Sequence, residues 1–346
     1  MAERIVILRF SALGDIALLV PVVHALKQAH PHTEITIVSR PFAADLFSPL
    51  SVNFYPVNLK NYQGLAGLWR LSRELHQKLN PDVVLDMHNV LRTQVIRQYF
   101  ALKGKRIAVI DKGRSEKKEV TRKKNKKLKR LRHTAERYTE VCVKAGFPFH
   151  FNPLASPQLP YQSPRANELL VKSKLQFNVG IAPLARHRAK EWPRNKWLQF
   201  MENPENEAVH WWLFGGPDEA EKLQELLTNS GKQGTVVAGK LKLGEELALM
   251  KHLDAMIAQD SSNMHLATLA GIPVISIWGA THPYLGFRPL GAANQNYMIQ
   301  RSSEELSCRP CSAFGNKPCW RGDYACLEFL PQERVQKALQ LVLFAQ

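Results

Sequence analysis

The sequence lacks any run of about 18 uncharged apolar residues, the length that is needed to cross a bilayer. The nearest candidate, Ile5 to Leu26, is interrupted by Arg9 and Asp15. No signal-peptide cleavage pattern follows the Met-Ala-Glu-Arg start. Cysteine is scarce, with 5 in 346 residues. These absences predict a cytoplasmic protein whose thiols are reduced or bind metal, because structural disulfides belong to oxidising compartments.

Acidic residues are also few, with 30 Asp and Glu against 47 Lys and Arg, a formal net charge of +17. The imbalance is local: Lys103 to Arg132 contains fifteen Lys or Arg and three acidic residues. Hydrophobic residues make up 45% and charged residues 22%, as in ordinary globular proteins. The composition therefore excludes a wholly disordered, collagen-like or disulfide-stapled chain. It points instead to a globular protein with one strongly basic segment.

The length predicts two domains, and both halves alternate short β-branched runs with amphipathic stretches. Such alternation predicts parallel sheets covered by helices in an α/β fold. Five prolines between residues 147 and 164 mark a linker. We predict domains at 1–155 and 165–330, and a last helix at 331–346 that could pack back on the first domain. Strands are predicted at 4–10, 34–39, 52–57, 82–87, 106–110, 178–182, 208–214, 235–238, 255–258 and 273–278, and helices at 15–29, 65–79, 90–101, 133–146, 195–202, 218–227, 244–252, 262–270 and 332–344.

Asp15 is the sharpest feature of the first half. It follows the first predicted strand and a turn that contains Gly14, and it opens a helix. Ligands of open α/β sheets bind at the carboxyl ends of strands, where a carboxylate can act as a general base. An N-cap role for Asp15 is the competing interpretation. The G-x-G-x-x-G pattern of dinucleotide-binding folds is absent here.

The segment DSSNMH, residues 260–265, follows another predicted strand and opens a helix. Free amides at a helix N-terminus bind anions such as a diphosphate. We therefore predict an anion site at this turn, with an N-capping run and a core histidine as the alternative. The residues concerned are Asp260, Ser261, Ser262, Asn263 and His265.

Three further loops contain residues with chemical potential. Lys190 follows a strand and could neutralise charge on a leaving phosphate, although a solvated basic loop is the simpler alternative. Glu219 follows the Gly-Gly turn at 215–216 and could bind ribose hydroxyls or merely begin a helix. Four cysteines form a C-x2-C-x7-C-x6-C pattern that fits either a structural zinc site or free thiols: Cys308, Cys311, Cys319 and Cys326.

Three motifs together resemble glycosyltransferase family 9, the bacterial heptosyltransferases of the lipopolysaccharide inner core. They are ILRFSALGDI at residues 7–16, HTAERY at 133–138, and DSSNMHLA at 260–267, which continues to GIPVISIWGATHP at 271–283. The resemblance covers nearly the whole chain. One departure is Ser262, where the family often has glycine. A positive φ there would cost more with serine.

The resemblance implies a GT-B fold, with an acceptor domain followed by a nucleotide-sugar domain. By resemblance, Asp15 is the catalytic base, and Lys190 contacts the donor phosphate or the departing diphosphate. The other residues expected to bind the donor are Gly14, Glu219, Asp260, Ser261, Ser262, Asn263 and His265.

The resemblance implies an inverting heptose transfer from ADP-heptose to an acidic inner-core glycolipid, without a metal or cofactor. The basic segment is expected to hold the enzyme on the anionic inner-membrane face. One alternative is a transferase of the same fold that uses another nucleotide-sugar or glycan. A second is a basic nucleic-acid-binding protein, although the segment lacks aromatic residues that would stack on bases. A solvated loop without a partner is the third.

Overall fold

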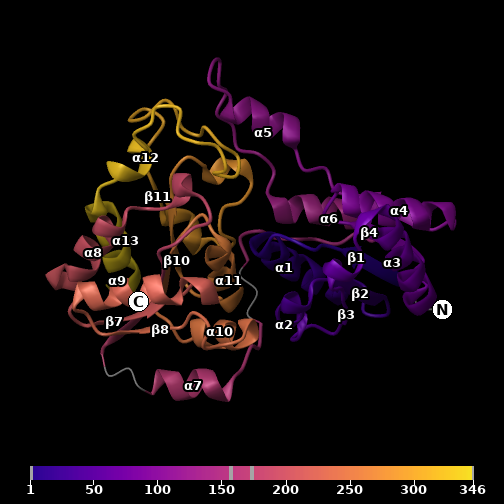
Figure 1. The fold of residues 1–346 in the computed structure, drawn as a ribbon, viewed down its shortest axis with the longest axis horizontal. Helices are drawn as coiled ribbons and strands as arrows, with labels where there is room; N and C mark the ends of the chain where they lie inside the picture. The colour runs from indigo at the N-terminus through magenta and orange to yellow at the C-terminus, as the bar shows by residue number, and fades with distance from the viewer. Residues whose placement is uncertain (1–2, 156–158, 172–174, 345–346) are drawn as a thin grey trace. The chain divides into compact units, whose positions relative to one another are not determined.

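The computed structural model describes residues 3–155, 159–171 and 175–344, so residues 156–158 of the predicted linker and 345–346 of the last predicted helix lie outside the described part. The chain forms two compact units. The first comprises Met1–Arg114 and Arg132–Pro153, and the second comprises Ser115–Leu131 and Leu154–Gln346. Figure 1 labels most of their strands and helices.

The first unit is built on a five-stranded parallel sheet in the order β3-β2-β1-β4-β5. Its central strand β1 aligns Ile7 with Ile37 of β2 and with Leu85 of β4. Because the central strands are covered on both faces, they consist almost entirely of buried apolar residues. The strands are β1 (Arg4–Leu8), β2 (Glu34–Ser39), β3 (Asn53–Pro56), β4 (Val83–Asp86) and β5 (Arg106–Val109).

Helices cover both faces of this sheet. Helices α3 and α4 pack against each other and share one apolar cluster with alternate residues of the central strands, such as Val6, Val38 and Val84. Helices α1 and α6 form the other pair. The helices are α1 (Leu13–Ala29), α2 (Ala44–Phe47), α3 (Gly64–Leu79), α4 (Leu91–Leu102) and α6 (Thr134–Lys144).

The second unit contains a six-stranded parallel sheet in the order β11-β10-β9-β6-β7-β8. Its strand β11 was not predicted from the sequence. The strands are β6 (Phe177–Ala182), β7 (Val209–Leu213), β8 (Gly234–Val236), β9 (Ala255–Gln259), β10 (Val274–Trp278) and β11 (Met298–Gln300).

One face of the second sheet packs on α8, α9 and α13 around buried tryptophans, and α10 and α11 pack against each other. We expected that the last helix could return to the first domain. Instead, its buried side chains, Val335 and Leu339 among them, belong to the core of the second unit. The helices of this unit are α7 (Pro164–Leu170), α8 (Arg194–Glu202), α9 (Ala220–Ser230), α10 (Leu243–Met250), α11 (Ser262–Ala270), α12 (Ala325–Glu328) and α13 (Gln332–Phe344).

Residues 115–131, which we call the basic strap, belong to the second unit, although the sequence placed them within a first domain of 1–155. The strap contains most of α5 (Arg114–Thr121). Val120 and Leu131 of the strap form a small apolar cluster with Leu285, and the Lys126 ammonium donates to the Cys308 carbonyl at 2.6 Å. The basic segment, which the sequence analysis assigned to an anionic membrane surface, is therefore partly anchored by contacts within the second unit.

No helix within the described ranges combines the length and apolarity needed to cross a membrane.

Candidate functional site

The parallel sheet of the first unit gathers the loops after β1, β4 and β5 at one edge. Asp15 lies there as the third residue of α1. Its carboxylate forms an ion pair with Arg9, with 2.5 Å between Oδ2 and Nη2. It also accepts the Ala12 amide at 3.3 Å. The N-cap of α1 is Ala12, so the N-cap interpretation of Asp15 is wrong. Asp15 instead contacts the N-cap amide from the third helical position, while its side chain stays partly accessible.

Arg9 is the buried partner of that pair. Its Nη1 donates to the Met87 carbonyl after β4 at 2.6 Å, and its guanidinium lies 5.8 Å from the ring centroid of Tyr138. The Tyr138 hydroxyl in turn donates to the Asp15 carbonyl oxygen at 3.2 Å. These contacts hold the Arg9 guanidinium at a fixed place and therefore orient the Asp15 carboxylate. The sequence analysis missed this role, for which the only signal was a charged residue at the end of an apolar strand.

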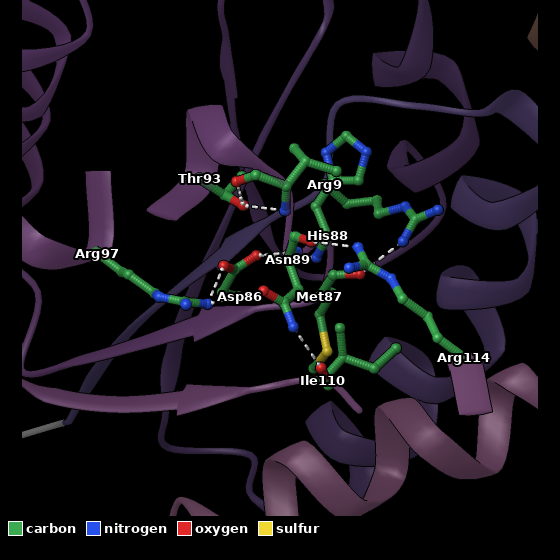
Figure 2. A network of polar contacts seen from close by, with 10 residues as sticks. Arg9, Asp86, Met87, His88, Asn89, Thr93, Arg97, Ile110 and Arg114 are labelled. Carbon is green, nitrogen blue, oxygen red and sulfur yellow. Dashed lines mark hydrogen bonds and ion pairs between the residues drawn. The ribbon is translucent and has the colours of Figure 1, made fainter. Parts of the chain in front are cut away.

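The loop after β4 is held by a buried carboxylate, as Figure 2 shows. Asp86 is fully buried and pairs with Arg97 at 2.9 Å. Its Oδ1 accepts the amides of His88 and Asn89. This network fixes the loop that presents both the Met87 carbonyl and the His88 ring.

His88 and Lys112 complete the surroundings of Asp15. Burial, reinforced by the positive charges of Arg9 and Lys112, lowers the pKa of His88 to about 3. His88 is therefore neutral at pH 7, and its Nε2 lies 3.4 Å from the Ser11 hydroxyl. Burial and the nearby guanidinium of Arg9 lower the pKa of Lys112 to about 8. Sequence reasoning had singled out neither residue.

The corresponding edge of the second unit brings Lys190 and Asp260 together. The Lys190 ammonium lies 2.8 Å from Asp260 Oδ2 and donates to the Asp260 carbonyl at 3.0 Å. Lys190 ends a short 3-10 turn after β6, whereas Asp260 directly follows β9. Because β6 and β9 are hydrogen-bonded neighbours, residues 70 positions apart meet at one sheet edge.

The predicted anion-binding turn follows Asp260 directly. Ser261 has extended backbone and caps α11, and Ser262 is the first helical residue. Ser262 is not among the positive-φ residues, so serine in place of the family's glycine carries no cost there. The Ser261 hydroxyl oxygen is buried and has no hydrogen-bond partner among the described residues. Asn263 is half-buried and His265 is buried one turn into the helix.

The remaining predicted donor residues lie elsewhere. Gly14 belongs to the first unit, beside Asp15. Glu219 follows β7 in the second unit, and its carboxylate accepts the Gly216 amide at 2.7 Å. This is the turn-capping contact that the simpler interpretation predicts, and a ribose would have to compete with it.

The four cysteines of the C-terminal segment are free thiols. Burial raises the pKa of Cys326 to about 12 and also raises the pKa values of Cys308 and Cys311. In the part of the chain that the structure describes, no three His, Cys, Asp or Glu side chains are grouped to hold a metal ion.

Comparison with known proteins identifies relatives along the whole chain. Residues 68–316 match the family described as Glycosyltransferase family 9 (heptosyltransferase). A lipopolysaccharide core heptosyltransferase of Haemophilus influenzae is 23% identical over 288 residues, which cover 81% of this chain and 80% of the relative.

Two solved structures share the fold. A family 9 glycosyltransferase of Veillonella parvula has a TM-score of 0.77 and 21% identity, with 99% of this chain and 98% of that chain covered. The Escherichia coli ADP-heptose lipopolysaccharide heptosyltransferase II has a TM-score of 0.72 and 18% identity, with 99% of both chains covered. These similarities confirm the GT-B class predicted from the sequence. Because the family match spans well over half of the sequence, the chain belongs to glycosyltransferase family 9, the heptosyltransferase family.

Proposed function

We propose that this enzyme transfers a heptose from ADP-heptose to an acidic lipopolysaccharide inner-core acceptor, with inversion at the anomeric carbon. The observation that carries the proposal is the Lys190–Asp260 pair beside the N-terminus of α11. It provides a cation, a carboxylate and free helix amides at one sheet edge. A nucleoside diphosphate linked to a sugar needs all three.

In the second unit, the donor diphosphate would draw the Lys190 ammonium from Asp260 and accept the amides of Ser262 and Asn263, since the Ser261 amide already donates to the Gln259 carbonyl at 2.6 Å. The buried Ser261 hydroxyl, which has no partner among the described residues, is available as a further donor. Asp260, once released from Lys190, can accept hydroxyls of the donor sugar. The lysine and the amides would then stabilise the charge that develops on the leaving diphosphate.

In the first unit, Asp15 would take the proton from the attacking acceptor hydroxyl. That oxygen then forms the new bond to the anomeric carbon as the bond to the diphosphate oxygen breaks. Arg9 would keep the carboxylate oriented, since their contact is 2.5 Å long. Lys112 and Arg114 add positive charge at the same edge, which suits an acceptor with acidic groups.

The donor part of the proposal is tested by titrating the protein with ADP, UDP, GDP and their sugar conjugates. Selective binding of ADP-heptose, weakened in Asp260→Ala, supports it. A preference for UDP-sugars or GDP-sugars would retain the fold and chemistry but exclude heptose as the donor sugar. If the protein binds none of these nucleotides and binds RNA with a steep salt dependence, the nucleic-acid alternative takes its place.

We also propose that the enzyme works as a peripheral protein at the cytoplasmic face of the inner membrane. Several strap cations are exposed, and each Lys or Arg near an anionic surface contributes about 1 kcal/mol. Others are engaged within the second unit: Lys126 donates to the Ser307 and Cys308 carbonyls, and the Lys123 ammonium lies 4.3 Å above the Trp320 ring. The exposed strap cations that remain for a membrane include Lys124, Lys127 and Arg130.

This membrane proposal is tested by replacing those three residues with Gln and measuring sedimentation with vesicles that contain anionic lipid. We expect binding to fall and its salt dependence to flatten. The matched control replaces three exposed lysines elsewhere in the second unit, Lys222, Lys251 and Lys337. Equal binding by the two triple variants would show that the strap is not the membrane-binding element.

A further inference from the structure

The C-terminal segment 308–326, which we call the cysteine loop, lies directly against the side chain of Lys190. Gly315 of this loop has φ +72°, and a Cβ placed there would lie 2.6 Å from Lys190 Cγ and 2.9 Å from Cε. These distances are far below van der Waals contact. The backbone at Gly315 therefore covers the aliphatic stem of the lysine so closely that only glycine fits.

The far end of the same side chain is held by charge. The Lys190 ammonium reaches both the carboxylate and the backbone carbonyl of Asp260. A lysine side chain has four rotatable bonds, and fixing them costs up to about 2 kcal/mol in entropy. In this protein the loop backbone restricts the aliphatic part of the Lys190 side chain, and Asp260 binds its ammonium group. The position of the ammonium is therefore restricted before a ligand binds.

The cysteine loop is itself anchored to the backbone that supports Lys190. The amides of Cys311 and Ser312 both donate to the Ala280 carbonyl, at 3.0 and 3.2 Å. The Ala280 amide donates to the carbonyl of Ala189, the neighbour of Lys190, at 2.9 Å. A single residue, Ala280, therefore connects the cysteine loop to the turn that contains Lys190.

A buried arginine strengthens this anchor. Arg309 is 1% exposed, and its guanidinium donates to the carbonyls of Trp278, Gly279 and Thr281. It also donates to the Arg301 carbonyl and to the Gln300 side chain. With five such contacts the start of the loop is fixed to the carboxyl ends of β10 and β11.

The basic strap supports the same loop from its other side. The Phe314 ring, next to Gly315, lies 5.8 Å from the Phe287 ring. The Lys117 ammonium of the strap lies 4.3 Å from the Phe287 centroid and 5.7 Å from that of Phe314. Such cation–π contacts are stabilising when they are desolvated, and Lys117 is buried.

We infer that Gly315 is a positioning residue: the cysteine loop, through this glycine, holds the Lys190 ammonium at the place where it meets the donor diphosphate. The inference rests on the proposed function for the identity of the ligand, but its geometric part concerns only Lys190 and the loop. Neither the cysteine pattern nor the glycine predicts this role in the sequence, because 125 positions separate the two residues.

The test compares Gly315→Ala with Gly322→Ala. Both glycines lie in the cysteine loop with positive φ, +72° and +84°, but a Cβ at Gly322 would meet nothing within 4 Å. The two variants therefore carry a similar backbone strain, and only Gly315→Ala displaces Lys190. We expect Gly315→Ala to weaken ADP binding about tenfold, as for a lost charge-assisted contact, and Gly322→Ala to leave it unchanged.

Two further measurements make the inference falsifiable whatever the ligand. First, Gly315→Ala should have no additional effect on ADP affinity in a Lys190→Met background. Second, an amine-specific acylating reagent followed by peptide mass spectrometry should modify Lys190 faster in Gly315→Ala than in Gly322→Ala. Equal acylation rates in the two variants, or a full effect of Gly315→Ala without Lys190, would overturn the inference. If wild type binds no nucleoside diphosphate, the proposed function fails, and the acylation rates alone decide the inference.

Discussion

Each unit places an accessible pair of a carboxylate and a cation at the edge of its parallel sheet. In the first unit the cation is the more buried member of the pair, and in the second unit the carboxylate is. In the first unit the Arg9 side chain is 5% exposed and Asp15 is 26% exposed. In the second unit Asp260 is 8% exposed and Lys190 is 17% exposed. The first pair offers a carboxylate to an incoming ligand, and the second offers an ammonium.

This difference follows from how ion pairs behave in proteins. A buried charge needs its partner and its hydrogen bonds, because desolvation without them is costly. The more accessible member of each pair can exchange its partner for a ligand at lower cost. A carboxylate that is available to an acceptor hydroxyl suits proton abstraction, whereas an ammonium that is available to a diphosphate suits leaving-group stabilisation. The opposite burial of the two pairs thus divides the proposed reaction between the units.

The largest expected effect is that of Asp15→Asn. The amide cannot accept the acceptor proton, so kcat should fall by about 10²–10⁴-fold, the usual contribution of a general base. Transfer measured at saturating donor and acceptor checks this. Thermal unfolding should occur at a lower temperature than in wild type, because the buried Arg9 loses its ionic partner, so transfer is measured well below that temperature. A variant that retains most of its activity would remove Asp15 from the mechanism.

The second-largest effect is expected for Lys190→Met. It keeps the aliphatic stem that packs under Gly315 but removes the charge, so kcat should fall by about 10²–10³-fold. Single-turnover transfer with saturating donor isolates this effect from binding. Lys196→Met on α8 is the control, and similar losses in both variants would point to a general effect of charge rather than to the site.

His88, which lies beside the Arg9–Asp15 pair, allows a test through the pH dependence of the free energy of unfolding. Its folded pKa of about 3 lies below the ordinary value of 6.5, so below pH 6.5 only the unfolded chain binds the proton. The free energy of unfolding should therefore decrease as the pH is lowered, and it should be about 2 kcal/mol smaller at pH 5 than at pH 7. In His88→Asn this acid sensitivity should shrink, whereas His32→Asn, at an exposed position in the same unit, should retain it. Denaturant unfolding at pH 7 and pH 5 distinguishes these outcomes.

Arg9→Lys gives the smallest expected change. Lysine keeps the charge but lacks the planar fork that contacts Asp15 and the Met87 carbonyl together. We expect kcat to fall about tenfold, because one charge-assisted contact is lost. The KM for the donor should be unchanged. A rise in donor KM at constant kcat would mean that Arg9 binds the donor instead of orienting Asp15.

Local signals predicted much of the fold. Strand β2, helix α11 and helix α13 have the bounds predicted from their apolar patterns. The short helix α7 was missed at the end of the proline-rich segment, although its cap was readable: Ser163 accepts the Ala166 amide, and Pro164 occupies the first helical position.

The candidate site was predictable only in part. Asp15, Lys190 and Asp260 stand out because they follow predicted strands, and each parallel sheet gathers such positions at its own edge. The packing of Gly315 on Lys190 and the contact of Lys126 with the Cys308 carbonyl, 182 positions away, depend on tertiary structure alone. A basic run in a sequence also does not show which of its lysines and arginines make contacts within the protein and which remain available to a partner.

The most direct test of the division between the units is calorimetric titration of ADP into wild type, Asp15→Asn and Lys190→Met. The account predicts that Lys190→Met weakens ADP binding about tenfold or more, since a charge-assisted contact is lost. It predicts that Asp15→Asn binds ADP as wild type does, although its turnover is lost. Weaker ADP binding in Asp15→Asn, with Lys190→Met unaffected, would contradict the account.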